Sequence, residues 1–225
     1  MKKKVLLMID KQLILFDLDG TVIDSGEGVK NSVLYALSTL GYPLLKKEEM
    51  DPFLGPPLVY SFHHFAGVPE AECAEAVRLY REYYQKNGGM FQYALYAGMP
   101  ELLRDLRAAG YKTAIATSKP QPYAIELMHH AGIFEYLDHI VGADLDEITR
   151  AKKSEVIEAV LEESGVEKVN ALMIGDRKYD VLGAKEVGVE SLGITFGYGD
   201  RAELTEAGAD LVLDTVDQLR AYLLG

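Results

Sequence analysis

The sequence predicts an α/β protein built on a doubly wound parallel sheet, with a small helical domain inserted after the first strand. Four short apolar runs, at residues 13–16, 111–117, 170–174 and 191–196, are typical of strands covered on both faces. Helical patterns alternate with the later runs, which implies parallel strands joined by right-handed crossovers. Between residues 24 and 96 the patterns are helical, and no buried strand is evident.

Helix boundaries are marked by proline and glycine. Pro100 opens one predicted helix and Gly110 closes it, because proline suits the first helical turn and glycine suits the turn that follows a helix. Because the patterns between residues 24 and 96 are helical, we expect a core made of residues 1–23 and 97–225, and an inserted helical domain made of residues 24–96.

The composition limits the partners of the chain. Its 225 residues include 23 Lys and Arg against 35 Asp and Glu, a net charge of −12, which disfavours a nucleic acid partner. An anionic substrate would need a local cation or a metal ion. The lone cysteine, Cys73, suits a reducing compartment. The apolar stretch at residues 5–9 is too short to cross a membrane. We expect a cytoplasmic protein without a membrane partner, and its oligomeric state stays open.

Two carboxylates follow the first apolar run, in the segment Asp17-Leu18-Asp19-Gly20-Thr21. Ligands of an open α/β sheet bind outside the carboxyl ends of its strands, where Asp17 is expected. Such close carboxylates repel each other unless a cation lies between them or one takes a proton. The first solution suits Mg²⁺, which prefers oxygen ligands, and the second suits acid catalysis. The alternative is an acidic turn that caps a helix.

A second acidic segment follows the run at residues 170–174. Asp176 comes directly after Gly175 and should reach the same sheet edge as Asp17. Asp180 begins the next helical pattern, where an acidic residue is also favoured by the helix dipole. Asp180 is therefore either a neighbour of the site or a structural residue.

Hydroxyl and lysine side chains complete the set of candidates. Thr117 and Ser118 end a buried strand, where a hydroxyl can donate to a phosphoryl oxygen or can cap the following helix. Lys152 and Lys153 precede an amphipathic helix, a place where a lysine is usually solvated.

In this order, the four segments resemble the motifs of the haloacid dehalogenase superfamily of phosphatases. The segment from Asp17 to Thr21 resembles the first motif, and Thr117 matches the second. Lys153 matches the third, with Lys152 as an alternative register, and the segment from Gly175 to Asp180 resembles the fourth. The helical insert is similar to the small cap of the subclass that includes phosphoglycolate phosphatases and β-phosphoglucomutases.

The resemblance implies a Mg²⁺-dependent phosphatase that hydrolyses small phosphate monoesters through an aspartyl-phosphate. It makes Asp17 the nucleophile and Asp19 the general acid and base. The implied metal ligands are Asp17, Asp176 and Asp19, the last through its backbone carbonyl, with Asp180 behind them. The implied phosphate-binding residues are Gly20, Thr117, Ser118 and Lys153.

Several functions stay open at this point. The substrate is open: 2-phosphoglycolate is the namesake of the group that the chain resembles, and nucleoside monophosphates and pyrophosphate are alternatives, because substrate choice in the superfamily lies largely in the cap. A phosphosugar mutase would use the same two aspartates. A receiver-type signalling domain also clusters aspartates, a hydroxyl and a lysine, but lacks such an insert. The stretch at residues 5–9 departs from the family pattern and is either an added strand or a leader.

Overall fold

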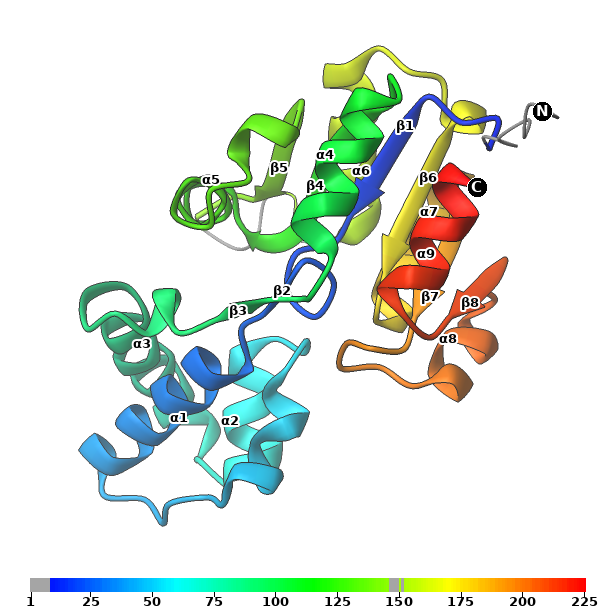
Figure 1. Cartoon of the computed structure of the whole chain (residues 1–225). Helices are drawn as coiled ribbons and strands as arrows, with labels where there is room; N and C mark the ends of the chain where they lie inside the picture. Colours follow the sequence, from blue (N-terminus) through cyan, green and yellow to red (C-terminus); the bar gives the residue numbers. More distant parts are fainter. Residues whose placement is uncertain (1–8, 146–149, 151) are drawn as a thin grey trace, which may run out of the picture. The chain divides into compact units, whose positions relative to one another are not determined.

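The computed structural model describes residues 9–145, 150 and 152–225. The chain divides into two compact units, one made of Met1–Ile23 and Leu95–Gly225, the core, and the other of Asp24–Ala94, the cap (Figure 1). Except for Ile9, the apolar stretch at residues 5–9 lies outside the described residues. Two short strands, β2 (Ile23–Asp24) and β3 (Ala94–Leu95), pair where the chain passes from one unit to the other.

The core is built on a six-stranded parallel sheet in the order β5-β4-β1-β6-β7-β8, so the predicted doubly wound α/β fold is confirmed. The order grows in both directions from β1, which makes the carboxyl end of β1 a switch point where ligands bind in such folds. The strands are β1 (Leu13–Phe16), β4 (Lys112–Pro120), β5 (His139–Ala143), β6 (Ala171–Gly175), β7 (Glu190–Ile194) and β8 (Leu211–Leu213).

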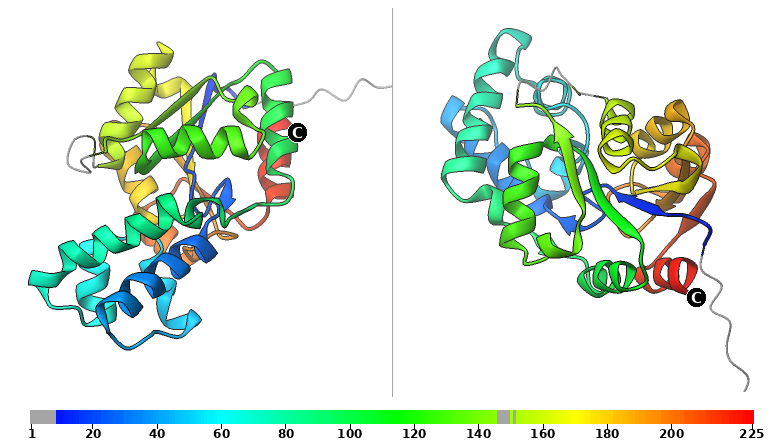
Figure 2. Two further views of the ribbon diagram at one scale, coloured as in Figure 1. Left: turned by 90° about the vertical axis from the view of Figure 1, so that its left-hand side faces the viewer. Right: turned by 90° about the horizontal axis from the view of Figure 1, so that it is seen from above.

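Helices cover both faces of this sheet. Figure 2 shows α4 (Met99–Ala108) and α9 (Val216–Leu224) together on one face of the sheet, and α6 (Lys153–Ser164) and α7 (Lys178–Val187) on the other. Leu13 and Leu15 of β1 are fully buried in one cluster with Val156 and Ile157 of α6. Ile14 and Phe16, equally buried, point to the opposite face because side chains alternate along a strand. The continuous apolar run of β1 therefore reflects burial on both faces, as the sequence predicts.

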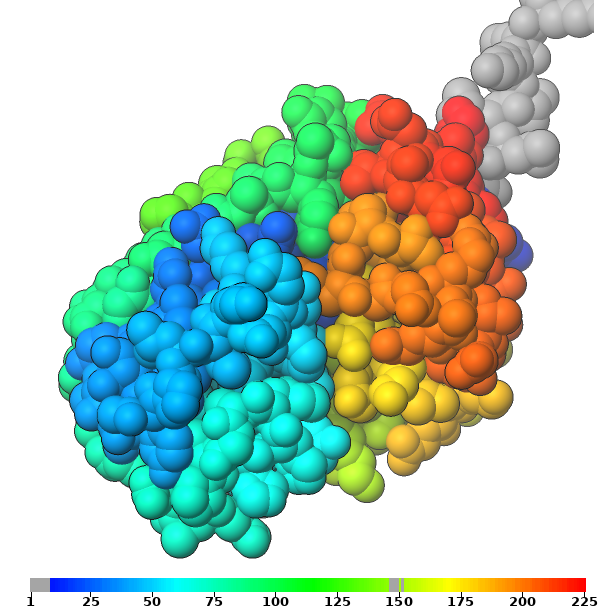
Figure 3. Space-filling view, turned by 90° about the horizontal axis from the view of Figure 1, so that it is seen from below, coloured from blue at the N-terminus to red at the C-terminus, as the bar shows by residue number. Residues whose placement is uncertain are grey.

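The helices of the core begin and end near the predicted punctuation. The helix α4 (Met99–Ala108) has Pro100 in its first turn, and Gly110 follows it with a φ of +92°. The α8 helix (Arg201–Ala207) lies on the surface of the core, within the orange part of the space-filling view (Figure 3). The other helices are α5 (Gln121–His130), α6 (Lys153–Ser164), α7 (Lys178–Val187), α8 (Arg201–Ala207) and α9 (Val216–Leu224).

The cap is helical and has its own apolar centre. Phe62 makes edge-to-face ring contacts with Phe53, at 5.4 Å between ring centroids, and with Tyr80, at 6.5 Å. Cys73 is buried in the same unit, as a free thiol. The cap helices are α1 (Gly26–Leu40), α2 (Leu58–Ala66) and α3 (Glu70–Lys86), with two short 3₁₀ helices, η1 (Lys47–Phe53) and η2 (Gly89–Phe91). Within the part of the chain that the structure describes, every helix is too short or too polar to cross a membrane.

Strand register brings the polar strand ends together. Phe16 at the end of β1 lies beside Ile115 of β4 and beside Ile174 of β6. The residues just beyond, Asp17 after β1 and Asp176 after β6, therefore emerge at one edge of the sheet, next to Thr117 on β4.

Substitution of Leu15 tests how far the fold depends on this central strand. Leu15→Ala should lower the free energy of unfolding by about 2–5 kcal/mol, because it removes buried methyl groups and leaves a cavity. The matched control is Leu182→Ala, at a leucine that is 48% exposed, which should change stability by no more than about 0.5 kcal/mol. Urea denaturation of both variants gives the comparison, and equal losses would contradict this account of the core.

Candidate active site

The carboxylate of Asp17 is held at the end of the central strand. Its backbone N–H donates to the carbonyl oxygen of Ile174 at 2.9 Å, which continues the β1–β6 ladder by one residue. The chain then turns away from the sheet at Gly20, whose φ of +88° is the left-handed backbone that glycine adopts without strain. The Gly20 N–H donates to the carbonyl oxygen of Ile23 at 2.8 Å and closes the turn. Asp17 is thus a buried carboxylate on a rigid support.

Asp176 is fully buried, and two loops approach it closely at glycine residues. The Tyr198 N–H donates to its Oδ2 at 2.7 Å, and the Thr21 hydroxyl donates to its Oδ1 at 3.2 Å. A Cβ atom on Gly20 would lie 2.2 Å from Oδ2, and one on Gly197 would lie 2.5 Å from the Asp176 Cβ. The glycines therefore let two backbones close over the carboxylate.

Lys153, the first residue of α6, points into this group of carboxylates. Its Nζ lies 2.8 Å from Asp17 Oδ1 and 2.8 Å from Asp180 Oδ1, and it donates to the carbonyl oxygen of Ala116 at 3.0 Å. Lys152, the alternative register, is exposed. Of the two lysines, only Lys153 joins the buried group in the described structure.

Asp180 belongs to the same buried group. It lies in the first turn of α7, and its Oδ2 accepts a hydrogen bond from the Arg177 N–H at 3.1 Å. Asp17, Asp176 and Asp180 each offer one oxygen, and these oxygens lie within 4.8 Å of one another. The geometry thus places Asp180 directly beside Asp17 and Asp176, a choice that the sequence leaves open.

The charges of this group do not balance. Three carboxylates and one ammonium give −3 + 1 = −2 in a buried place. Burial raises the pKa of Asp17 to about 7, although Lys153 opposes the shift, and burial also raises the pKa of Asp176 well above its usual range. For Lys153, burial opposes the charge, but the carboxylates of Asp17 and Asp180 outweigh it and raise the pKa of the ammonium. A divalent cation would supply the missing charge.

The other predicted residues lie at the rim of this group. The carboxylate of Asp19 accepts a hydrogen bond from Lys119 Nζ at 2.9 Å, and its side chain is absent from the three-carboxylate group. Thr117 is buried, and its Oγ1 accepts from the Lys119 N–H at 3.1 Å. Ser118, one residue on, is exposed. The structure therefore brings Asp17, Asp176 and Lys153 together, whereas the side chain of Asp19 pairs with Lys119.

Sequence reasoning missed three partners of these residues: Thr21 and Tyr198, which bond to Asp176, and Lys119, which bonds to Asp19. For Thr21 the signal was its place inside the first motif. A backbone N–H such as that of Tyr198 carries no sequence signal, although the glycines on either side of it point to a close approach of backbones.

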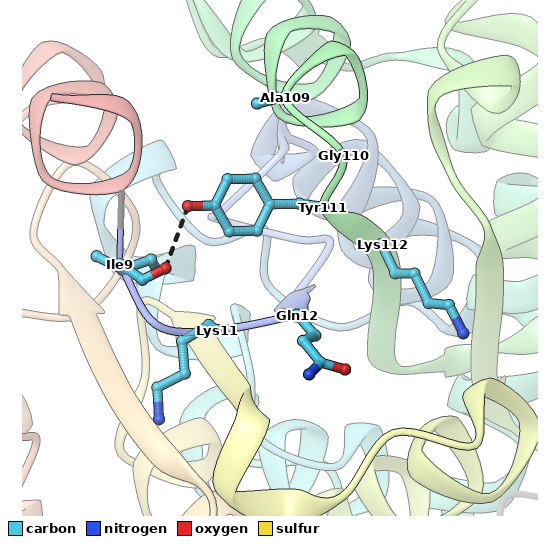
Figure 4. A pocket seen from close by; sticks show the side chains of 7 residues that line it. All are labelled: Ile9, Lys11, Gln12, Ala109, Gly110, Tyr111 and Lys112. Atoms are coloured by element: carbon cyan, nitrogen blue, oxygen red, sulfur yellow. Dashed lines mark hydrogen bonds between the residues drawn. The ribbon is translucent and has the colours of Figure 1, made fainter. Parts of the chain in front are cut away.

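A cavity of about 350 Å³ lies at the opposite, amino edge of the sheet (Figure 4). Its lysines already have partners, since Lys11 pairs with Glu190 at 2.8 Å and Lys112 donates to the carbonyl oxygen of Ser164 at 2.8 Å. Because the cavity lies at the amino edge of the sheet, it is separate from the carboxylate group at the opposite edge. Its lining residues are Ile9, Lys11, Gln12, Ala109, Gly110, Tyr111 and Lys112.

A doubly wound core with these carboxylates and a buried lysine at its switch point defines a hydrolase of the haloacid dehalogenase-like type. Residues 14–194 match the family model described as haloacid dehalogenase-like hydrolase, and the chain belongs to this family. Within the family it is a phosphatase, as the phosphoglycolate phosphatase and 5'-nucleotidase relatives that match most of its length indicate; other relatives of similar coverage are named tyrosine-protein kinases.

Two relatives and one solved structure carry this assignment. A 5'-nucleotidase of Pseudomonas aeruginosa is 40% identical over 191 residues, which cover 85% of this chain and 86% of that protein. A phosphoglycolate phosphatase of Vibrio parahaemolyticus is 30% identical over 219 residues, which cover 93% and 95%. A haloacid dehalogenase-like family hydrolase of Streptococcus pneumoniae superimposes with a TM-score of 0.88 at 32% identity, over 96% of this chain and 99% of that one. The prediction of the family is confirmed, and the receiver-domain alternative is excluded.

Neighbouring lysines give a matched test of the buried group. Lys153→Met should destabilise the metal-free protein by about 3–5 kcal/mol near pH 8, because it leaves carboxylates buried without their cation. Lys152→Met, at an exposed position, should change stability by no more than about 0.5 kcal/mol.

The pH dependence of that loss follows from the carboxyl groups. When folding raises the pKa of a carboxyl group, the folded protein becomes less stable as the pH rises and the group loses its proton. For Asp17 this loss of stability continues until the pH passes its folded-state pKa of about 7. The penalty of Lys153→Met should therefore be smaller near pH 5.5 than near pH 8. Denaturation of both variants at the two pH values measures it, and a penalty that does not depend on pH would contradict the proposed charge balance.

Proposed function

We propose that this phosphatase hydrolyses small phosphate monoesters with Mg²⁺ and forms an aspartyl-phosphate on Asp17. The observation that carries the proposal is the buried group of three carboxylates and one lysine, with its net charge of −2, at the switch point of the sheet. Without a metal ion, this charge either stays uncompensated, which costs several kcal/mol in a buried place, or is removed by protonation of carboxyl groups whose pKa burial raises.

The donor set fits a hard divalent cation. Asp17, Asp176 and Asp180 offer only oxygen atoms, which Mg²⁺ prefers to nitrogen or sulfur. We assign Asp17 and Asp176 as ligands, with the backbone carbonyl of Asp19 as a further one and Asp180 beside them. When bound, Mg²⁺ supplies positive charge that allows a phosphate dianion to approach a carboxylate.

In the first proposed step, an Asp17 carboxylate oxygen attacks the phosphorus. A bond forms between that oxygen and phosphorus, and the bond from phosphorus to the ester oxygen breaks. Asp19 gives its proton to the leaving oxygen, which departs as an alcohol. In the second step Asp19 takes a proton from water, which attacks the acyl phosphate, releases inorganic phosphate and restores Asp17.

Two further residues hold the phosphoryl group in this proposal. Lys153 lies 2.8 Å from Asp17, so its ammonium lies close to the oxygens of a phosphoryl group bound there. Thr117 lies on the neighbouring strand, where its hydroxyl can donate to another of these oxygens. Charge that develops on these oxygens in the transition state is stabilised by such fixed donors.

For the substrate, the relatives support two classes, phosphoglycolate-like esters and nucleoside monophosphates, because they are named for these activities. A phosphate-release screen over phosphorylated metabolites, pyrophosphate included, ranked by kcat/KM, decides between them. The mutase alternative is tested with β-glucose 1-phosphate: glucose 6-phosphate as the product would favour a mutase, and free phosphate favours the hydrolase.

Removal of the nucleophile is the direct test of the mechanism. Asp17→Asn should lower kcat for p-nitrophenyl phosphate on the order of 10³-fold or more, because the variant cannot form the acyl phosphate. Circular dichroism should show an unchanged fold. Asp10→Asn, at an exposed aspartate, is the matched control and should keep normal turnover. Near-normal hydrolysis by Asp17→Asn would refute the assignment of the nucleophile.

Metal dependence has a readout that does not need turnover. Mg²⁺ at about 100 times its Kd should stabilise the folded protein by ~2.7 kcal/mol, seen as a rise in melting temperature. Asp176→Asn should lose this rise, because a ligand and its charge are gone. Chelation by EDTA should stop phosphate release and added Mg²⁺ should restore it, whereas full activity in thorough chelator would contradict the metal assignment.

A further inference from the structure

Lys119 is a second lysine at the catalytic edge, and it lies on the side of Asp19. Its Nζ donates to Asp19 Oδ1 at 2.9 Å. Its side chain is only 8% exposed, whereas that of Asp19 is 28% exposed. Lys119 is thus more enclosed than the carboxylate it contacts, which is unusual for a lysine in a surface ion pair.

The backbone of Lys119 is fixed at both of its peptide groups. The Lys119 N–H donates to Thr117 Oγ1 at 3.1 Å. Its carbonyl oxygen packs against Gly142 of β5, where a Cβ atom would come within 2.3 Å of it. The register between β4 and β5 shifts between Thr117 and Pro120, so β4 bends at this position. The ammonium is therefore carried by a rigid strand end, the kind of support that binding groups need.

The two lysines of this edge divide it into two sides. Lys153 serves the side of Asp17 and Asp180, where the phosphoryl group is placed. Lys119 serves the side of Asp19, the residue that hands a proton to the leaving oxygen under the proposed function. A general acid must come within hydrogen-bond reach of that oxygen, roughly 2.6–3.2 Å. An ammonium in contact with the same carboxylate therefore lies within a few ångströms of the leaving group.

We propose that Lys119 binds an anionic group on the leaving portion of the substrate. This inference rests on the proposed function and names its substrate class: phosphate esters with a carboxylate or a second phosphate one or two atoms beyond the ester oxygen. On binding, the ammonium exchanges the Asp19 carboxylate for the anionic group of the substrate. In a chain of net charge −12, such a fixed cation distinguishes an anionic leaving group from a neutral one.

Two matched pairs of substrates test the assignment. The first pair is 2-phosphoglycolate and its neutral amide, and the second is ethane-1,2-diyl bisphosphate and 2-hydroxyethyl phosphate. The wild type should prefer the anionic member of at least one pair in kcat/KM. Lys119→Met should reduce that preference by about 10- to 100-fold, the value of one hydrogen bond between charged groups. Lys119→Arg, which keeps the charge, should retain part of it.

A control variant separates this effect from a general loss of positive charge. Lys178→Met removes an exposed lysine at the start of α7 and should leave the preference unchanged. Melting temperatures of all variants show whether they fold. If Lys119→Met does not fold, Lys119→Arg still provides the test. Loss confined to one pair identifies the carboxylate or the phosphate as the group bound.

The outcomes also separate this inference from the proposed function. Equal kcat/KM within both pairs for a wild type that hydrolyses p-nitrophenyl phosphate would overturn the role of Lys119 and leave the phosphatase in place. Retention of the wild-type preference by a folded Lys119→Met variant would overturn that role as well. A wild type that releases phosphate from no ester in the presence of Mg²⁺ would overturn both.

Discussion

The ion pair between Lys153 and Asp17 is the interaction on which the rest of the site depends. Its two residues are 136 positions apart in the chain and meet at 2.8 Å. Taking both charges out of water is costly, so the pair persists only where the surroundings hold it in place. Strand β1 fixes one partner and the start of α6 fixes the other. The carboxylates of Asp176 and Asp180 then lie close to a cation that balances only one of the three negative charges.

The lack of side chains at Gly20 and Gly197 is as important for this site as its charges. Asp176 is enclosed by backbone, and its oxygens are satisfied by the Tyr198 N–H and the Thr21 hydroxyl. Side chains at Gly20 or Gly197 would collide with it. The carboxylate of the second acidic segment is therefore enclosed only because two loops that are distant in sequence, at residues 20–21 and 197–198, pack against it. A buried carboxylate with fixed donors has little freedom to move, which is the preorganisation that metal binding and phosphoryl transfer require.

The catalytic edge combines two ion pairs of different character. Lys153 is buried among carboxylates that are themselves buried, so its pair belongs to the core of the fold. Lys119 contacts a carboxylate that is partly open to solvent, so this pair can exchange its partner at lower cost. Under the proposed function, this difference in the burial of the two carboxylates separates the role of Lys153, which is to hold the reacting group, from that of Lys119, which is to meet a variable leaving group.

The sequence by itself determined the fold class, the order of buried strands and the strand ends that carry polar residues. These are local properties: a doubly buried strand needs a continuous apolar run, and its carboxyl end is where ligands of such sheets bind. Asp17, Asp176 and Thr117 could be placed at one edge for this reason. The family pattern also selected Lys153, while the spacing alone did not separate it from Lys152.

Only the tertiary structure decided which of these groups meet. Asp180 is a helix-start acid by its sequence, and it joins the carboxylates because the first turn of α7, which packs against β6, brings one of its oxygens within 4.8 Å of oxygens of Asp17 and Asp176. Lys119 contacts Asp19 across 100 positions of chain. Such contacts depend on how loops and helix starts converge in space, which no periodicity records, because their energy comes from long-range charge and close packing and not from local propensity.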